Sequence, residues 1–123
     1  MNNFFKKISL FGFFFLTSFI IGYSSISRFD YDKLLKIDGP LSDINIYKRV
    51  VEKGLDGIAE EKRVGPRFLT SLLSNYVYKF SKDKIRSWNP VFFSLLIVNS
   101  FFVSLICLLM SKYYKFLNII KFK

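Results

Sequence analysis

An uninterrupted run of twenty uncharged residues at positions 91–110, VFFSLLIVNSFFVSLICLLM, constrains this chain more than any other feature. At 1.5 Å per residue, a helix of this length reaches about 30 Å, the thickness of the hydrocarbon core of a bilayer. Asn89 and Pro90 stand before the run, and these residue types are favoured as helix N-cap and first helical residue. Trp88 marks this end as an interfacial anchor. The pattern predicts a membrane-spanning helix over residues 90–110.

A second apolar run, ISLFGFFFLTSFIIGYSSI at residues 8–26, follows Lys6 and Lys7 near the start of the chain. As a helix it reaches about 28 Å, which also fits a bilayer. Two interpretations are open: a signal peptide cleaved at the small-x-small triplet 22–24, or a retained anchor. The length and bulk of the run, with Tyr23 at an interfacial position, favour a retained spanning helix.

The charged residues predict how these two spans are oriented. Both tails, residues 1–7 and 111–123, are basic and lack acidic residues, whereas all nine carboxylates and thirteen of the nineteen basic residues lie between the runs. Short basic flanks favour the cytoplasmic side, so we expect both termini inside and the loop at residues 27–89 outside. The loop can be basic because the rule weakens in loops longer than about 60 residues. The predicted fold is an all-α, multi-pass protein of the cell (inner) membrane, with two transmembrane helices in a hairpin and an extracytoplasmic loop of short amphipathic helices.

Two short helices are predicted within the loop. One runs over residues 42–53, with Ser42 or Asp43 as N-cap and Gly54 as the C-terminal stop. The other covers residues 67–80. Its apolar stripe comprises Leu69, Leu72, Leu73, Tyr76 and Phe80, and Arg67, Ser71 and Ser74 lie opposite. This second helix fits either a position in the membrane interface or a place in a small packed domain.

Composition excludes several classes of function. The chain has no His, and its one Cys, Cys107, lies inside the second apolar run. A Cys/His zinc site, an intramolecular disulfide and a His general base are therefore excluded. Asp30 and Asp32 could contact a hard cation, but two carboxylates do not make a site, and we predict no metal and no cofactor. Basic residues flank the spans or alternate with acids, so nucleic acid is not expected as a partner.

The order of residues in the loop carries a family resemblance. Asp43 opens a helix that contains Tyr47, Gly54 ends it, and Arg63 or Arg67 precedes an amphipathic helix and a span. Over roughly residues 4–110 this order resembles the N-terminal region of polytopic GT-C-type glycosyltransferases, which take sugars from lipid-phosphate donors. The resemblance implies that Asp43 acts as a base on the acceptor and that Arg63 or Arg67 binds the donor phosphate.

The same residues have plainer interpretations. Asp43 is also a suitable N-cap, and Arg63 and Arg67 are also suitable interfacial cations. Two spans enclose no donor cavity, so we expect the chain to be inactive alone, as an N-terminal part or a degenerate relative of such an enzyme. The alternative function is a non-enzymatic accessory protein that binds a larger membrane partner. A third possibility is a secreted-type protein with a cleaved signal and one anchor.

Asn99 lies at the middle of the second span, where an amide requires a partner. If the spans pair antiparallel, Thr17 and Ser18 fall at a matching depth, and we predict helix–helix contact between these three residues. Small residues spaced four apart would let the spans approach closely: Ser18 with Gly22, and Ser100 with Ser104.

Overall fold

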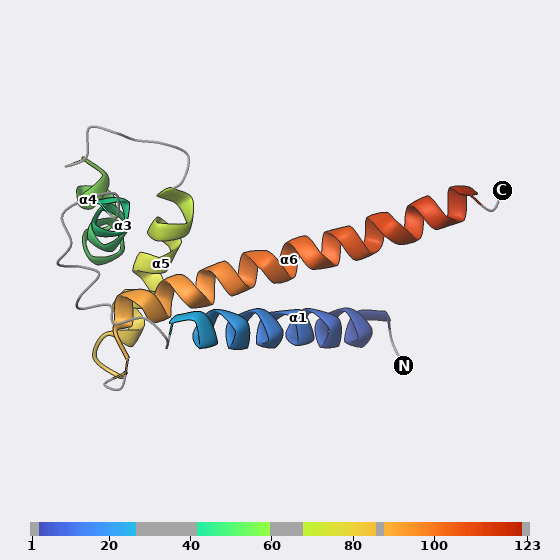
Figure 1. The fold of residues 1–123 in the computed structure, drawn as a ribbon, viewed down its shortest axis with the longest axis horizontal. Helices are drawn as coiled ribbons and strands as arrows, with labels where there is room; N and C mark the ends of the chain where they lie inside the picture. Colours follow the sequence, from blue (N-terminus) through green and yellow to red (C-terminus); the bar gives the residue numbers. More distant parts are fainter. Residues whose placement is uncertain (1–2, 27–41, 60–67, 86–87, 122–123) are drawn as a thin grey trace.

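The computed structural model describes residues 3–26, 42–59, 68–85 and 88–121, and every regular element in these ranges is a helix. Two long helices, α1 (Asn3–Ile26) and α6 (Pro90–Lys121), lie alongside each other. Three short helices, α3 (Ser42–Lys53), α4 (Leu55–Ala59) and α5 (Phe68–Ser81), gather at the end where α6 begins (Figure 1). The predicted all-α fold, with two long apolar helices separated by short ones, is confirmed.

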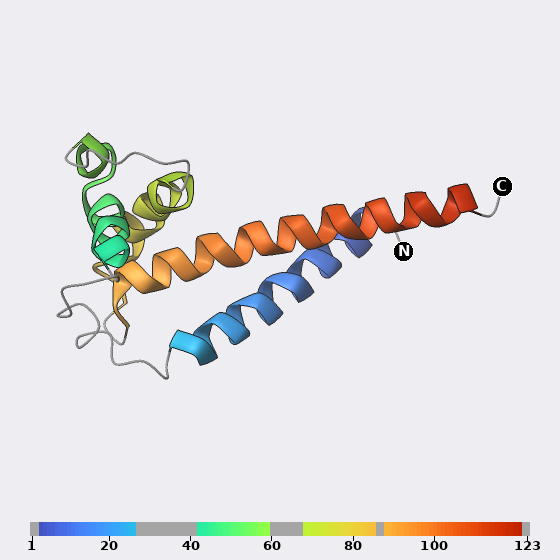
Figure 2. The ribbon, with the colours of Figure 1, turned by 45° about the horizontal axis from the view of Figure 1, so that its top comes forward.

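Two helices are long and apolar enough to cross a membrane, over Phe5–Ser25 and Pro90–Tyr114. α6 does not stop at residue 110 but continues without interruption through the predicted basic tail to Lys121. In Figure 2 it extends beyond the beginning of α1. Asn89 caps α6 as expected, because its Oδ1 accepts a hydrogen bond from the Val91 amide at 3.0 Å.

Aromatic rings join α1 to α6 along their antiparallel contact. Phe11 meets Phe101 edge-on, with ring centroids 5.6 Å apart. Toward the other end of α1, the Tyr23 ring stacks on Trp88 at 4.5 Å. Offset and edge-on ring pairs add about 0.5–1.5 kcal/mol each beyond their buried area. Trp88, which the sequence predicted to be an interfacial anchor, therefore helps to hold the hairpin together.

Small residues lie on both α1 and α6 in the region where these helices pack. The Cβ atom of any larger residue at Gly22 would collide with the Leu96 side chain. On α6, Ser100 and Ser104 are buried, and the Ser104 hydroxyl donates to the Ser100 carbonyl at 2.6 Å. The small-residue spacing read from the sequence thus falls within the region where these helices pack, as expected for spans that associate without a hydrophobic driving force.

The three short helices, which we call the cap, are held together at the end of α3. Gly54 has a φ of 69°, and its amide donates to the Val50 carbonyl at 2.8 Å, which ends α3 where the sequence predicted. Asn75 of α5 donates to the Val51 carbonyl at 2.6 Å. The α4 turn was not predicted. It depends on Gly57, where a Cβ would lie 2.7 Å from the Arg49 carbonyl oxygen.

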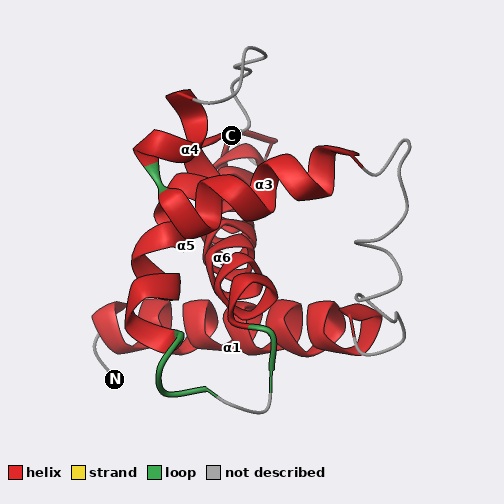
Figure 3. Ribbon diagram, turned by 90° about the vertical axis from the view of Figure 1, so that its left-hand side faces the viewer, coloured by secondary structure: helices red, strands yellow, loops and turns green. Residues whose placement is uncertain are grey.

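Helix α5 packs with its small polar residues inward. Ser71, Ser74 and Asn75 are buried, whereas Tyr76 and Phe80 are 68% and 71% exposed. α5 packs on both α3 and α6, and Figure 3 shows the cap and α1 on different sides of α6. The helix belongs to a packed unit, as one of the two interpretations expected. Most of its apolar stripe is exposed, and its position in a membrane interface stays a prediction.

Candidate functional site

Two open grooves flank a ridge that Leu95 and Asn99 form on α6. The first, the cap groove, has a volume of about 520 Å³. Its lining residues are Tyr47, Leu69, Thr70, Ser71, Leu95, Asn99 and Phe102. The second, the span groove, has a volume of about 380 Å³ between α1 and α6. Its lining includes Ser18, Gly22, Ser25, Leu95, Leu96, Asn99 and Ser100. Asn99 thus faces both grooves from an exposed position on α6.

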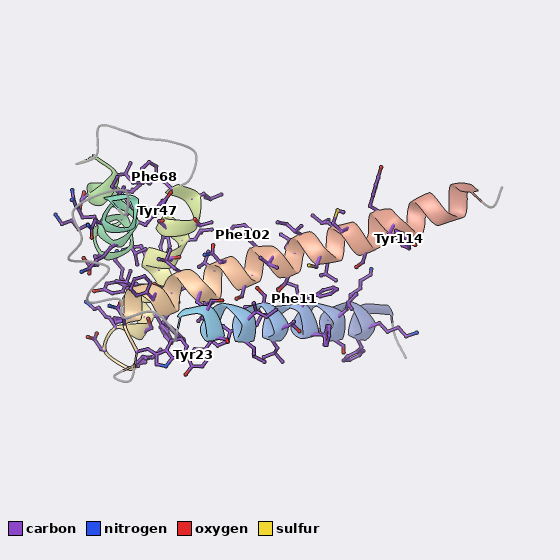
Figure 4. The ribbon with its side chains drawn as sticks, in the orientation of Figure 1. Phe11, Tyr23, Tyr47, Phe68, Phe102 and Tyr114 are labelled. Atoms are coloured by element: carbon purple, nitrogen blue, oxygen red, sulfur yellow. The ribbon has the colours of Figure 1, made fainter. Side chains whose placement is uncertain are left out.

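The cap groove is formed where the cap meets the first half of the second span. α5 supplies one wall and α6 the other, and Tyr47 comes from α3. Figure 4 shows Tyr47 and Phe102 on the same side of α6. Ser71 is 1% exposed, and its hydroxyl has no hydrogen-bond partner among the described residues. A buried hydroxyl without a partner costs about 1–3 kcal/mol, so Ser71 is a polar group of this wall whose hydrogen bond remains to be accounted for.

The span groove contains a second hydroxyl of the same kind. Ser100 is 1% exposed, and its Oγ lacks a hydrogen-bond partner within the described part of the chain. Opposite it, Ser18, Gly22 and Ser25 follow one another at spacings of four and three residues along α1, which places them on one helix face. The span groove is therefore a shallow channel lined by small residues, with two polar groups of α6, Ser100 and Asn99, on its other wall.

The structure brings together part of the contact predicted at the middle of the spans. Ser18 and Asn99 line the same groove. Thr17 is exposed, and its hydroxyl donates to the Phe13 carbonyl of its own helix at 2.9 Å. A direct bond from Asn99 to Thr17 stays a prediction.

Of the residues that carry the glycosyltransferase resemblance, Tyr47 lines the cap groove, whereas Asp43, Arg63 and Arg67 contribute no described side chain to either groove. Asp43 lies in the first turn of α3, but its side chain is outside the described part. Arg63 and Arg67 fall in the segment 60–67, and Asp30 and Asp32 in the segment 27–41, both outside the described residues. Among the residues that are described, no three His, Cys, Asp or Glu side chains cluster where a metal could bind.

One titratable side chain in the cap, the phenol of Tyr78, has a shifted pKa. The pKa of Tyr78 lies above its ordinary value of 10.0, chiefly because burial disfavours the phenolate. The negative charges of Glu52 and Asp83 act in the same direction. Tyr78 is therefore a neutral phenol at physiological pH.

Sequence reasoning did not single out Ser71, Asn75 or Ser100 as functional side chains. Ser71 was recognised only as lying opposite the apolar stripe of its helix. The available signal was the spacing of small polar residues on two helices, at positions 71, 74 and 75 and at 94, 100 and 104. Such spacing predicts close helix packing, but it does not predict which hydroxyl remains without a partner.

No known protein family, curated protein or solved structure matches this chain. The two grooves are therefore interpreted from their own chemistry.

Proposed function

We propose that this chain is a non-enzymatic accessory protein of the cell membrane that binds a transmembrane helix of a larger membrane protein in the span groove. The observation that carries the proposal is the buried Ser100 hydroxyl, which lacks a partner among the described residues and lines a groove of small residues. The Asn99 amide lines the same groove. Both groups belong to a helix long and apolar enough to cross a membrane.

A partner helix would satisfy both features of the groove. Small residues such as Ser18 and Ser25 let another backbone approach closely, and Ser and Asn side chains form hydrogen bonds between helices. Each such bond contributes about 0.6 kcal/mol on average and up to about 2 kcal/mol in model peptides. Lipid chains offer Ser100 no hydrogen-bond acceptor at this depth, so a helix is the better occupant.

The proposed topology is a multi-pass hairpin in the cell membrane, with both termini in the cytoplasm and the cap outside. Lys6 and Lys7 at the start of α1 and Lys112 near the end of α6 support it, because all three are exposed and basic flanks favour the cytoplasmic side. The cap would then stand on the outer surface, beside the bound partner.

Site-specific photo-crosslinking in cells tests the proposal. A photoreactive residue at Ser25 should capture one membrane protein, whereas the same residue at Ile20, which is 62% exposed and outside the groove, should not. Ser18→Phe should fill the groove and abolish the adduct, and Ile20→Phe should leave it unchanged. Equal capture from Ser25 and Ile20, or capture of a second copy of this chain alone, would overturn the proposal.

The resemblance to GT-C-type glycosyltransferases supports a second proposal. In it, the chain is related to the N-terminal part of such an enzyme and transfers no sugar by itself. The support is the order of Asp43, Tyr47, Gly54 and Arg63 or Arg67 in the sequence.

A further inference from the structure

We propose that the cap groove binds one acyl chain of a membrane glycerophospholipid between α5 and α6, with the ester group of the lipid at Ser71. The proposal concerns a different groove from the one assigned to a protein partner. It is independent of the function proposed above.

The cap groove lies at the level where a bilayer surface is expected. One wall of the groove belongs to α6, a helix long and apolar enough to cross a membrane, and the other wall belongs to the cap. The cap lies at the beginning of α6 (Figure 1). Leu69 of α5 lines the groove and is exposed, and Leu73, one turn further along the same helix, is exposed as well. A helix that turns its apolar side outward and its serines inward is suited to contact with lipid. In a bilayer, the ester groups of the lipids lie at the boundary between the hydrocarbon core and the polar headgroup region, which is the level expected for the beginning of a spanning helix.

The polar groups of the groove match a lipid ester. The Ser71 hydroxyl is buried and has no hydrogen-bond partner among the described residues, so it is available to donate to an ester carbonyl. Asn99 on the opposite wall offers an amide donor as well. Leu69, Leu95 and Phe102 provide the apolar surface along which a hydrocarbon chain would lie.

The borders of the groove favour a chain over a helix. Tyr47 of α3 and residues of α5 line the groove on the cap side, and α6 lines it on the other side. An acyl chain is one carbon wide, whereas a helix with its side chains is about 10 Å wide. The span groove differs because, among the described residues, only α1 and α6 line it, with no cap helix on its border.

The test uses the full chain in phosphatidylcholine vesicles that contain a small fraction of phosphatidylcholine with a photoreactive diazirine in one acyl chain. After irradiation, peptide mass spectrometry should locate adducts at Leu69 and Leu95 well above those at Ile106, which is exposed on α6 outside both grooves. Ser71→Ala, which removes the hydroxyl and little volume, should lower labelling in the groove about fivefold, the factor for one lost hydrogen bond.

Two further variants complete the test. Thr70→Phe should fill the groove and remove the adducts at Leu69, whereas Ile106→Phe should leave them unchanged. If Thr70→Phe loses helical circular dichroism, the Ser71→Ala result decides the question. Labelling spread evenly over the exposed faces of α1 and α6, or unchanged by Ser71→Ala, would overturn the proposal. So would capture of a protein, rather than lipid, by a photoreactive residue at position 69 in cells.

Discussion

Asn75 shows how one buried side chain fixes the relation between two helices. It is 3% exposed, and its amide donates to the carbonyls of Val51 at 2.6 Å and Glu52 at 3.4 Å. These carbonyls belong to the last turn of α3, where no intrahelical donor remains for them. Asn75, although it belongs to α5, therefore satisfies the carbonyls at the C-terminus of α3.

Replacing Asn75 with Leu should lower the free energy of unfolding of the cap by about 1–3 kcal/mol, because a buried carbonyl loses its donor. Hydrogen exchange of amides in α3 would measure the loss. Tyr76→Leu is the matched control, since Tyr76 is the next residue and is 68% exposed. It should change the stability by less than about 0.5 kcal/mol. Equal effects of the two substitutions would show that the bond to α3 does not stabilise the cap.

Tyr78 gives a prediction about pH. Burial, with the nearby Glu52 and Asp83 carboxylates, raises its pKa above 10.0. Because the folded state then holds the phenolic proton more tightly than the unfolded state, the associated stability is complete below pH 10 and is lost as pH rises through the raised pKa. The phenolate absorbance of the native chain minus that of Tyr78→Phe should show one group ionising above pH 10. Ionisation at or below that value would contradict the prediction.

Residues that act locally were predictable, and those that act across the fold were not. Gly54 as a helix stop and Asn89 as an N-cap follow from rules that involve only a few neighbouring positions. Asn75 reaches a carbonyl 24 positions away, and Ser71 lies in a groove built from three helices. Their roles depend on which helix faces meet, and periodicity alone does not determine this.

Helix α5 illustrates the same limit at the scale of elements. Its bounds, Phe68–Ser81, lie within one residue of the predicted helix. Periodicity correctly separates an apolar face from a small polar face, but it does not tell which face is buried. In water the apolar face would be expected inside. Next to a bilayer the preference can reverse, because lipid accepts leucine as readily as a protein core does.

The contact between α1 and α6 can be tested at its two glycines. At Gly22 a side chain would collide with Leu96, whereas at Gly12 no atom lies within 4 Å of an added Cβ. Gly22→Leu should weaken the pairing of the helices by about 1–3 kcal/mol through overpacking, and Gly12→Leu should not.

Cysteines at positions 11 and 101, in a background lacking Cys107, would measure this pairing. Phe11 and Phe101 are in ring contact, so a short bifunctional thiol reagent should crosslink the two cysteines efficiently. Crosslinking should fall in Gly22→Leu and remain high in Gly12→Leu. Equal yields in both variants would mean that close approach at Gly22 does not govern the hairpin.

At the scale of the whole molecule, the sequence predicted two long helices and a helical loop, but it did not predict that the cap packs on α6. The two apolar runs are recognisable because they have the length and lack of charge that a bilayer requires of a spanning helix. The position of the cap depends on contacts between α3, α5 and α6, which are distant in sequence. No local pattern records such contacts.

The topology of the hairpin is open to a direct test. A reporter that is active only outside the cytoplasm should be active when fused after Lys82, just beyond α5, and silent when fused after Lys123. The short basic flanks at Lys6, Lys7 and Lys112 are the reason for this expectation. The reverse pattern would place the cap in the cytoplasm and contradict the proposed orientation.

A further prediction concerns catalysis. Glycosyl transfer needs a base at the acceptor, cationic groups at the leaving phosphate and a dry pocket for the donor. Both grooves of the described structure are open, so the purified chain should show no more sugar transfer from lipid-phosphate donors than its Asp43→Asn variant. Turnover that Asp43→Asn abolishes would instead identify Asp43 as a catalytic base.

The packing of the cap on α6 also determines the order in which this fold can be completed during synthesis. The residues of α3 and α5 leave the ribosome before those of α6. Until α6 is made, the side of α5 that packs on it has no partner. The packing of the cap is therefore incomplete until α6, the last of the described helices, has been made. Translation of α6 then supplies both a helix long and apolar enough to cross a membrane and the surface on which the earlier segments pack.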